Sequence, residues 1–119
     1  MPFRDDAGRW RDILGALNLI EQFVDGMDFE TYQADDKTKS AVERQILILS
    51  EAAKLLGQAA EDQCPRHDWK GLRGMGDILR HAYHRVEDQI VWDTIAIELP
   101  ALKPCIASAV ENLSKPPRR

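Results

Sequence analysis

Apolar residues recur three and four positions apart through most of the chain, which is the spacing that places them on one side of an α-helix. The first such pattern predicts a helix over Trp10–Val24, ended by Asp25 and Gly26. A second pattern predicts a long helix from about Lys37 to Gly57. Asp35 or Asp36 can cap that helix. No segment alternates apolar and polar residues as a half-buried β-strand would.

The second half of the chain predicts three further helices. The first runs from Trp69 to about His84, the next covers Gln89–Glu98, and the last starts at Pro100 or Pro104 and reaches about Leu113. The connections over 27–36 and 58–67 are short, and a helical turn is expected near residues 29–32. The pattern therefore predicts an all-α, up-and-down four-helix bundle with one additional short helix. We expect one domain over residues 1–113 and a disordered basic tail over 114–119.

The predicted helix that starts at Trp69 has one strongly polar side. At about 100° per residue, Arg73, Asp77 and Arg80 fall on one stripe with His81 at its edge, opposite an apolar stripe. Asp77, His81 and Arg80 could present an acid, a base and a fixed positive charge to a phosphate. The alternative is that Asp77 simply pairs with Arg73 or Arg80 on an exposed face.

Composition narrows the classes of protein to consider. The chain has 119 residues and a net charge of −4, which argues against broad electrostatic binding of nucleic acid but leaves local basic clusters open. No apolar run is long enough to span a membrane. The charged N-terminus does not resemble a signal peptide, so we expect a cytoplasmic protein with Cys64 and Cys105 reduced. A homodimer is expected, because helices of this length leave apolar surface to cover.

Several separated segments, in order, resemble the HepT-like branch of the HEPN superfamily. Residues 36–56 are similar to the long second helix of that family, with Arg44 and the pair Glu51 and Ala52. Further similarity covers Trp69, residues 74–83, residues 90–92, Leu99 and Pro100. The resemblance implies a small helical protein of the HEPN fold, encoded beside a minimal nucleotidyltransferase antitoxin as its partner.

The active motif of the family is an arginine, a polar residue, three further residues, a histidine, one residue and a tyrosine. Here the polar residue is Asp77, the histidine is His81 and the tyrosine is Tyr83, but Gly76 stands at the arginine position. The resemblance implies a ribonuclease site at a dimer interface that needs no metal or other cofactor. His81 would act on the ribose 2′-hydroxyl or on the leaving oxygen, and Tyr83 would accept AMP from the partner.

The missing arginine leaves two interpretations open. Arg80 and Arg73 lie about one turn to either side of Gly76, so their guanidinium groups could form a phosphate-binding face. Alternatively, the protein has lost nuclease activity and binds a nucleotidyltransferase or presents a substrate to it.

Further interpretations concern residues outside the motif. Arg44 and Glu51 are expected to contact Asp77, His81 or Arg80 across the bundle, and Trp69 and Trp92 to anchor the core or an interface. Zinc binding that involves Cys64 is disfavoured, because no second cysteine lies near it.

Overall fold

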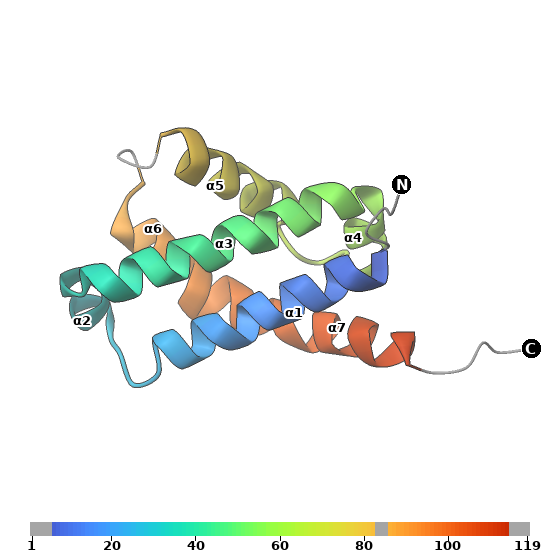
Figure 1. The fold of residues 1–119 in the computed structure, drawn as a ribbon, viewed down its shortest axis with the longest axis horizontal. Coiled ribbons are helices and arrows are strands. Elements are labelled where there is room, and N and C mark those ends of the chain that lie inside the picture. The colour runs from blue at the N-terminus through green and yellow to red at the C-terminus, as the bar shows by residue number, and fades with distance from the viewer. Residues whose placement is uncertain (1–5, 83–85, 115–119) are drawn as a thin grey trace, which may run out of the picture.

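The computed structural model describes residues 6–82 and 86–114, and these residues form helices and their connections, with no strand among them. The prediction of an all-α bundle is confirmed. In chain order the elements are α1 (Asp6–Phe23), α2 (Phe29–Ala34), α3 (Asp36–Leu56), α4 (Gln58–Gln63), α5 (Trp69–His81), α6 (Asp88–Asp93), the π-helical segment η2 (Thr94–Glu98) and α7 (Leu99–Leu113), as Figure 1 shows. The predicted basic tail lies outside the described residues except for Ser114.

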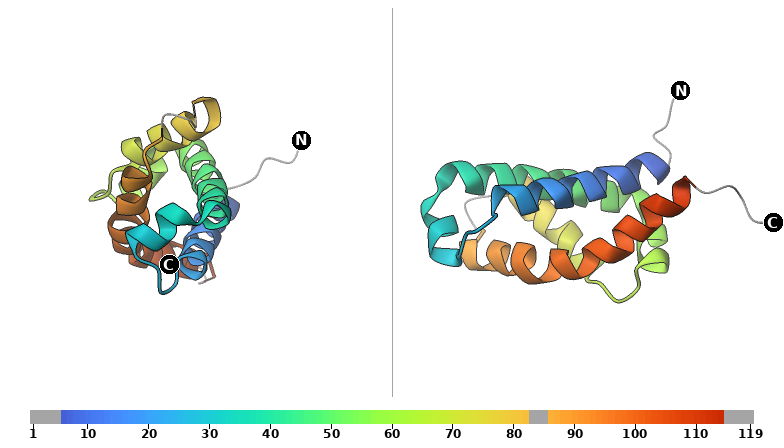
Figure 2. Two further views of the ribbon diagram at one scale, coloured as in Figure 1. Left: turned by 90° about the vertical axis from the view of Figure 1, so that its left-hand side faces the viewer. Right: turned by 90° about the horizontal axis from the view of Figure 1, so that it is seen from below.

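The long helices α1 and α3 pack side by side and organise the bundle. Helix α7 packs against α1, whereas α5 packs against α3, so α5 and α7 contact different long helices (Figures 1 and 2). Side chains such as Ile13, Ile46 and Ile106 are completely buried between these helices. Asp35 caps α3 by accepting a hydrogen bond from the Thr38 amide at 3.0 Å, which confirms one of its two predicted caps.

Trp69 fixes the start of α5 in this core. Its side chain is 1% exposed, its ring meets Trp10 edge to face at 6.5 Å, and its indole nitrogen donates to the Cys64 carbonyl at 2.9 Å. The half-buried Trp92 packs against the buried Tyr32 ring at 5.2 Å. The expectation that both tryptophans act as packing anchors is confirmed.

The two helices predicted over residues 89–98 and from a proline onward are one continuous helical run. In η2 the Leu99 amide bonds to the Thr94 carbonyl, which is a wider turn than that of an α-helix. Pro100 then lies in the first turn of α7. Because proline has no amide hydrogen and crowds the carbonyl one turn earlier, a local widening lets the helix pass through Pro100 instead of ending there.

Cys64 and Cys105 form a disulfide between the end of α4 and α7. The prediction that both thiols are free is therefore wrong. The fold places the two Cα atoms 6.1 Å apart, within the range that a disulfide spans. The two cysteines are 41 residues apart in the chain, and the sequence pattern does not indicate that the fold brings them together. The bridge also removes Cys64 as a thiolate ligand for zinc.

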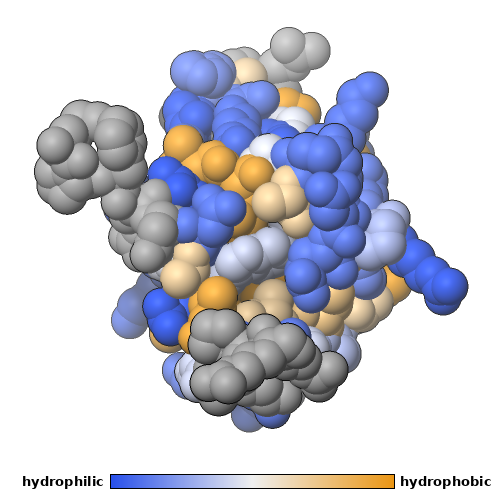
Figure 3. Space-filling view, turned by 90° about the vertical axis from the view of Figure 1, so that its right-hand side faces the viewer, coloured by the Kyte–Doolittle hydropathy of each residue, from blue (hydrophilic) through white to orange (hydrophobic). Residues whose placement is uncertain are grey.

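The surface of the described residues has both charged and apolar areas. Seen from the end of the bundle that carries α4, apolar residues lie exposed among hydrophilic ones (Figure 3). Leu55, near the end of α3, is 53% exposed. None of the described helices is both long enough and apolar enough to cross a membrane.

Candidate functional site

Helix α5 positions the residues of the predicted motif. Asp68 caps its N-terminus by accepting a hydrogen bond from the Gly71 amide at 2.8 Å, as the sequence predicts. Leu72 and Leu79 are buried, whereas Asp77, Arg80 and His81 are exposed. The predicted polar and apolar sides of this helix are therefore confirmed. The helix ends at His81, earlier than predicted, and Tyr83 and His84 lie outside the described residues.

His81 is the last residue of α5 and its side chain is open to solvent. The chain leaves the helix at Ala82, whose amide bonds to the Ile78 carbonyl at 2.7 Å. Arg80 and His81 thus occupy the last turn, where the partial negative charge of the helix terminus favours cations. Both side chains are exposed, so each is accessible to a phosphodiester from solvent.

Arg80 is held by Glu51 of α3. Its Nη2 donates to Glu51 Oε1 at 2.9 Å, and both side chains are partly exposed, at 38% and 47%. The predicted contact between Glu51 and Arg80 across the bundle is confirmed. Because the pair is solvated, it positions the guanidinium more than it stabilises the fold.

Asp77 forms an ion pair with Lys54 of α3, and not with Arg73 or Arg80. The Lys54 ammonium group holds the pKa of the Asp77 carboxyl below its usual range, and the charge of Arg80 adds to this effect. Asp77 is consequently a carboxylate at neutral pH and is not suited to donate a proton. Lys54 is not among the residues predicted for the site, although its position three residues after Glu51 places both on one side of α3.

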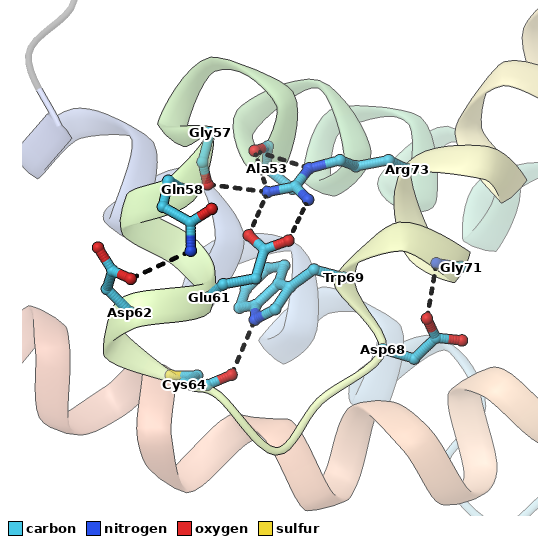
Figure 4. Close-up of polar contacts among 10 residues, drawn as sticks. All are labelled: Ala53, Gly57, Gln58, Glu61, Asp62, Cys64, Asp68, Trp69, Gly71 and Arg73. Atoms are coloured by element: carbon cyan, nitrogen blue, oxygen red, sulfur yellow. Dashed lines mark hydrogen bonds and ion pairs between the residues drawn. The ribbon is translucent and has the colours of Figure 1, made fainter.

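Arg73 has a different environment, as Figure 4 shows. Its guanidinium makes two bonds of 2.7 and 2.8 Å to the Glu61 carboxylate and also donates to the carbonyls of Ala53 and Gly57. Ala53 lies in the last turn of α3 and Gly57 directly follows that helix, and each carbonyl also accepts a backbone amide, from Gly57 and Ala60 respectively. Arg73 therefore ties α5 to the end of α3 and to α4, and these bonds would have to break before it could bind a phosphate.

Gly76, at the position of the motif arginine, lies directly against Ser50 of α3. A Cβ atom at residue 76 would lie 1.9 Å from Ser50 Oγ and 2.4 Å from Ser50 Cβ. Ser50 is itself fully buried, with its hydroxyl donating to the Leu47 carbonyl at 3.0 Å. The glycine thus permits a close approach of two helices, and no larger side chain fits there unless Ser50 changes too.

The fold and this arrangement define a small helical protein with a histidine-bearing motif on one helix of a bundle. A model of the family described as "Ribonuclease HepT-like" matches residues 13–109. The chain therefore belongs to the HepT-like family of the HEPN superfamily.

Individual relatives agree with this assignment. "Probable ribonuclease HepT" of Thermococcus cleftensis is 36% identical over 92 residues, which cover 77% of this chain and 84% of the relative. A protein of Methanocaldococcus jannaschii named as a "Putative RNase" is 31% identical over 115 residues, which cover 97% of this chain and 99% of that protein. No solved structure matches the chain.

Proposed function

We propose that this protein is a metal-independent endoribonuclease and the toxin of a two-gene toxin–antitoxin system in the cytoplasm. The observation that carries the proposal is the exposed His81 at the end of α5, next to an arginine that Glu51 holds in place, in a chain of a ribonuclease family. Arg80 is the cation nearest to the histidine along the chain and takes the place of the missing motif arginine.

The chemistry uses the ribose as the nucleophile. An imidazole accepts the proton of the 2′-hydroxyl, the oxygen O2′ bonds to phosphorus, and the bond from phosphorus to the 5′-oxygen breaks. The leaving oxygen takes up a proton, so the products are a 2′,3′-cyclic phosphate and a 5′-hydroxyl. Arg80 stabilises the negative charge that develops on the phosphoryl oxygens. Asp77 acts as a carboxylate that keeps Lys54 beside the motif.

We place this site at the interface of a homodimer. The reaction needs one group that accepts a proton and one that donates it, and a single chain offers one histidine at the motif position. Two copies that bring their α5 termini together would supply both groups. The exposed position of His81 at the end of its helix is compatible with this arrangement.

Regulation would act through Tyr83, two residues after His81. A minimal nucleotidyltransferase antitoxin would transfer AMP from ATP to its hydroxyl with release of pyrophosphate and of the hydroxyl proton, and the added phosphate would repel RNA from the site. Intact-mass measurement after coexpression with the cognate partner tests this step. We expect a mass increase of one or more AMP groups that is absent in Tyr83→Phe, and an unmodified wild-type chain would contradict it.

A second candidate function is supported by the contact between Gly76 and Ser50. Because α3 closes over the position of the motif arginine, the alternative is an inactive subunit that binds a nucleotidyltransferase or presents a substrate to it. The two functions differ in whether the wild-type protein cleaves RNA.

An RNA cleavage assay on four proteins separates them. The nuclease proposal predicts activity in the wild type and its loss in His81→Ala. The inactive-subunit alternative predicts activity only when the arginine is restored. Gly76→Arg alone would clash with Ser50, so the restored variant is Ser50→Gly with Gly76→Arg, and Ser50→Gly alone is the control. Absence of cleavage in the wild type would overturn the nuclease proposal.

A further inference from the structure

A groove runs between α5 and the segment formed by α6 and η2. It consists of two adjoining depressions of about 290 and 270 Å³, which share Met75 and Ile90. Along α5 it extends from Asp68 to Ile78, a length of about 15 Å at 1.5 Å per residue. None of its lining residues belongs to α3, and His81 is not among them. This surface is therefore separate from the candidate nuclease site.

Apolar side chains form the middle of the groove. Met75 is half-buried, and Ile78 and Ile90 are 48% and 53% exposed. Leu72 and Leu102, which also line the groove, are buried. Large aliphatic side chains that two segments of the chain expose to water in one groove indicate a surface that another molecule covers.

Carboxylates surround this apolar surface. Four of the lining residues carry them, namely Asp68, Glu87, Asp93 and Glu98. Among the described residues no lysine or arginine lines the groove, and even a protonated His67 leaves the lining with a net negative charge. Arg66 and Lys70 lie beside Asp68 in the chain, but neither is part of the lining. None of the four carboxylates forms an ion pair with another described residue, so their charges remain available to a cationic partner.

This combination of charge and apolar surface decides between different occupants. A second copy docked groove to groove by two-fold symmetry would place the same carboxylates opposite one another, and like charges across an interface are unfavourable. Nucleic acids and anionic membrane surfaces present phosphate groups, which the same carboxylates would repel. A segment of another protein that is both apolar and cationic meets neither obstacle.

We propose that this groove binds an amphipathic helix of a partner protein, with apolar residues on one face and lysines or arginines beside them. The apolar residues would pack on Met75, Ile78 and Ile90. The cations would pair with Asp93 and Glu98, which line the same end of the groove. Apolar contacts would supply most of the affinity, and the charges would select basic partners over acidic ones.

The dimensions of the groove favour a helix as the bound segment. A length of about 15 Å corresponds to about three helical turns, over which apolar residues at positions i, i+4 and i+7 lie on one face. Gly74 lines the α5 side, and nothing lies within 4 Å of a Cβ atom placed there. The backbone of a bound helix can therefore approach α5 closely at this point.

Fluorescence anisotropy with two designed peptides tests the proposal on the full-length protein. The probe is a labelled helix-forming peptide of about 15 residues, with leucines at positions i, i+4 and i+7 and lysines beside them. The matched peptide has glutamates in place of the lysines. We expect the lysine peptide to bind at low salt and the glutamate peptide to bind about tenfold more weakly or worse. Equal affinities of the two peptides, or no binding of the lysine peptide, would overturn the proposal.

Substitutions in the protein locate the binding. Ile90→Ser should weaken binding of the lysine peptide about tenfold, because it removes an apolar contact. Leu55→Ser is the matched control, since Leu55 is also 53% exposed but lies on α3 outside the groove. Glu98→Gln should weaken binding about threefold at low salt and reduce its salt dependence. Glu111→Gln removes the same charge from α7 outside the groove and should leave the affinity unchanged. Equal losses in each variant and its control would place the binding elsewhere and overturn the proposal.

Sedimentation velocity of the wild type and Ile90→Ser tests the competing occupant. Self-association of the wild type that Ile90→Ser abolishes, in a protein that does not bind the lysine peptide, would assign the groove to a second copy and overturn the proposal. We expect Ile90→Ser to leave the oligomeric state unchanged. No RNA is present in these measurements, so their outcome does not depend on the nuclease proposal.

Discussion

At the scale of single residues, the contact between Gly76 and Ser50 relates the missing motif arginine to the packing of α5 on α3. A glycine inside a helix ordinarily lowers its stability by about 1 kcal/mol relative to alanine. Gly76 is retained at a point where α3 and α5 approach so closely that a methyl group would overlap the Ser50 side chain. The loss of the motif arginine is therefore coupled to the contact between two helices.

This coupling predicts opposite effects at two glycines of α5. Gly76→Ala should lower the free energy of unfolding by about 1–3 kcal/mol through overpacking. Gly74→Ala should raise it by about 0.5–1 kcal/mol, because nothing lies within 4 Å of a Cβ atom there. Urea denaturation of both variants measures the difference. Ser50→Gly should rescue Gly76→Ala, since the nearest remaining atom, the Cα of residue 50, is 3.9 Å away. A stabilising effect of Gly76→Ala would refute this account.

Glu43 gives a pH-dependent prediction at the same scale. Burial raises the pKa of its carboxyl, the Asp88 charge raises it further, and Lys39 partly opposes both. Because the folded-state pKa exceeds the unfolded value, Glu43 contributes stability that is full below the unfolded pKa, near 4.3, and is lost as pH rises through the folded pKa. Glu43→Gln should therefore become more stable than the wild type as pH increases from about 4 toward neutrality.

Asp35→Asn provides the control of opposite sign for the Glu43 measurement. The Thr38 amide lowers the pKa of Asp35, so its contribution is present above the unfolded pKa and is lost as pH falls. Thermal unfolding of both variants from pH 2 to pH 8 measures the two trends, with that of Asp35→Asn confined to the acidic end. Parallel curves for Glu43→Gln and the wild type would contradict the stated effect of burial.

At the scale of elements, helical periodicity predicted the long helices well, and it failed where tertiary contacts decide. It placed α1, α3 and α5 and their buried sides, because each side is repeated over several turns. It could not show that a π-turn carries the chain through Pro100. It also could not show which cation pairs with Asp77. Arg73 lies about one turn away in the same helix and Lys54 lies in α3, and the pattern does not give the distance between the two helices. Only the packing of α5 on α3 separates their roles.

The separate roles predict how Arg73 responds to substitution. Arg73→Lys keeps the charge but cannot serve the Glu61 carboxylate and two carbonyls at once. Because the side chain is only 21% exposed, we expect the free energy of unfolding to fall by about 1–3 kcal/mol. The rate of RNA cleavage, measured well below the melting temperature, should not change. A loss of cleavage at unchanged stability would restore Arg73 as a phosphate ligand.

At the scale of the whole molecule, the disulfide closes a long loop that contains α5 and the candidate site. Closing a loop of 41 residues is expected to stabilise the folded chain by about 4 kcal/mol in the chain-entropy model. Reductant should lower the urea midpoint of the wild type and leave the double variant Cys64→Ser with Cys105→Ser unaffected. Two titratable thiols in the untreated protein, or a midpoint insensitive to reductant, would show that the bridge does not form.

We propose that His81 promotes cleavage of RNA by the ribose 2′-hydroxyl. The most direct measurement is the analysis of product ends after incubation of RNA with wild type and His81→Ala in the presence of EDTA. We expect 2′,3′-cyclic phosphate and 5′-hydroxyl ends from the wild type, with a rate about 10²–10⁴-fold lower in His81→Ala. Intact RNA in both reactions, or equal cleavage by both proteins, would contradict it.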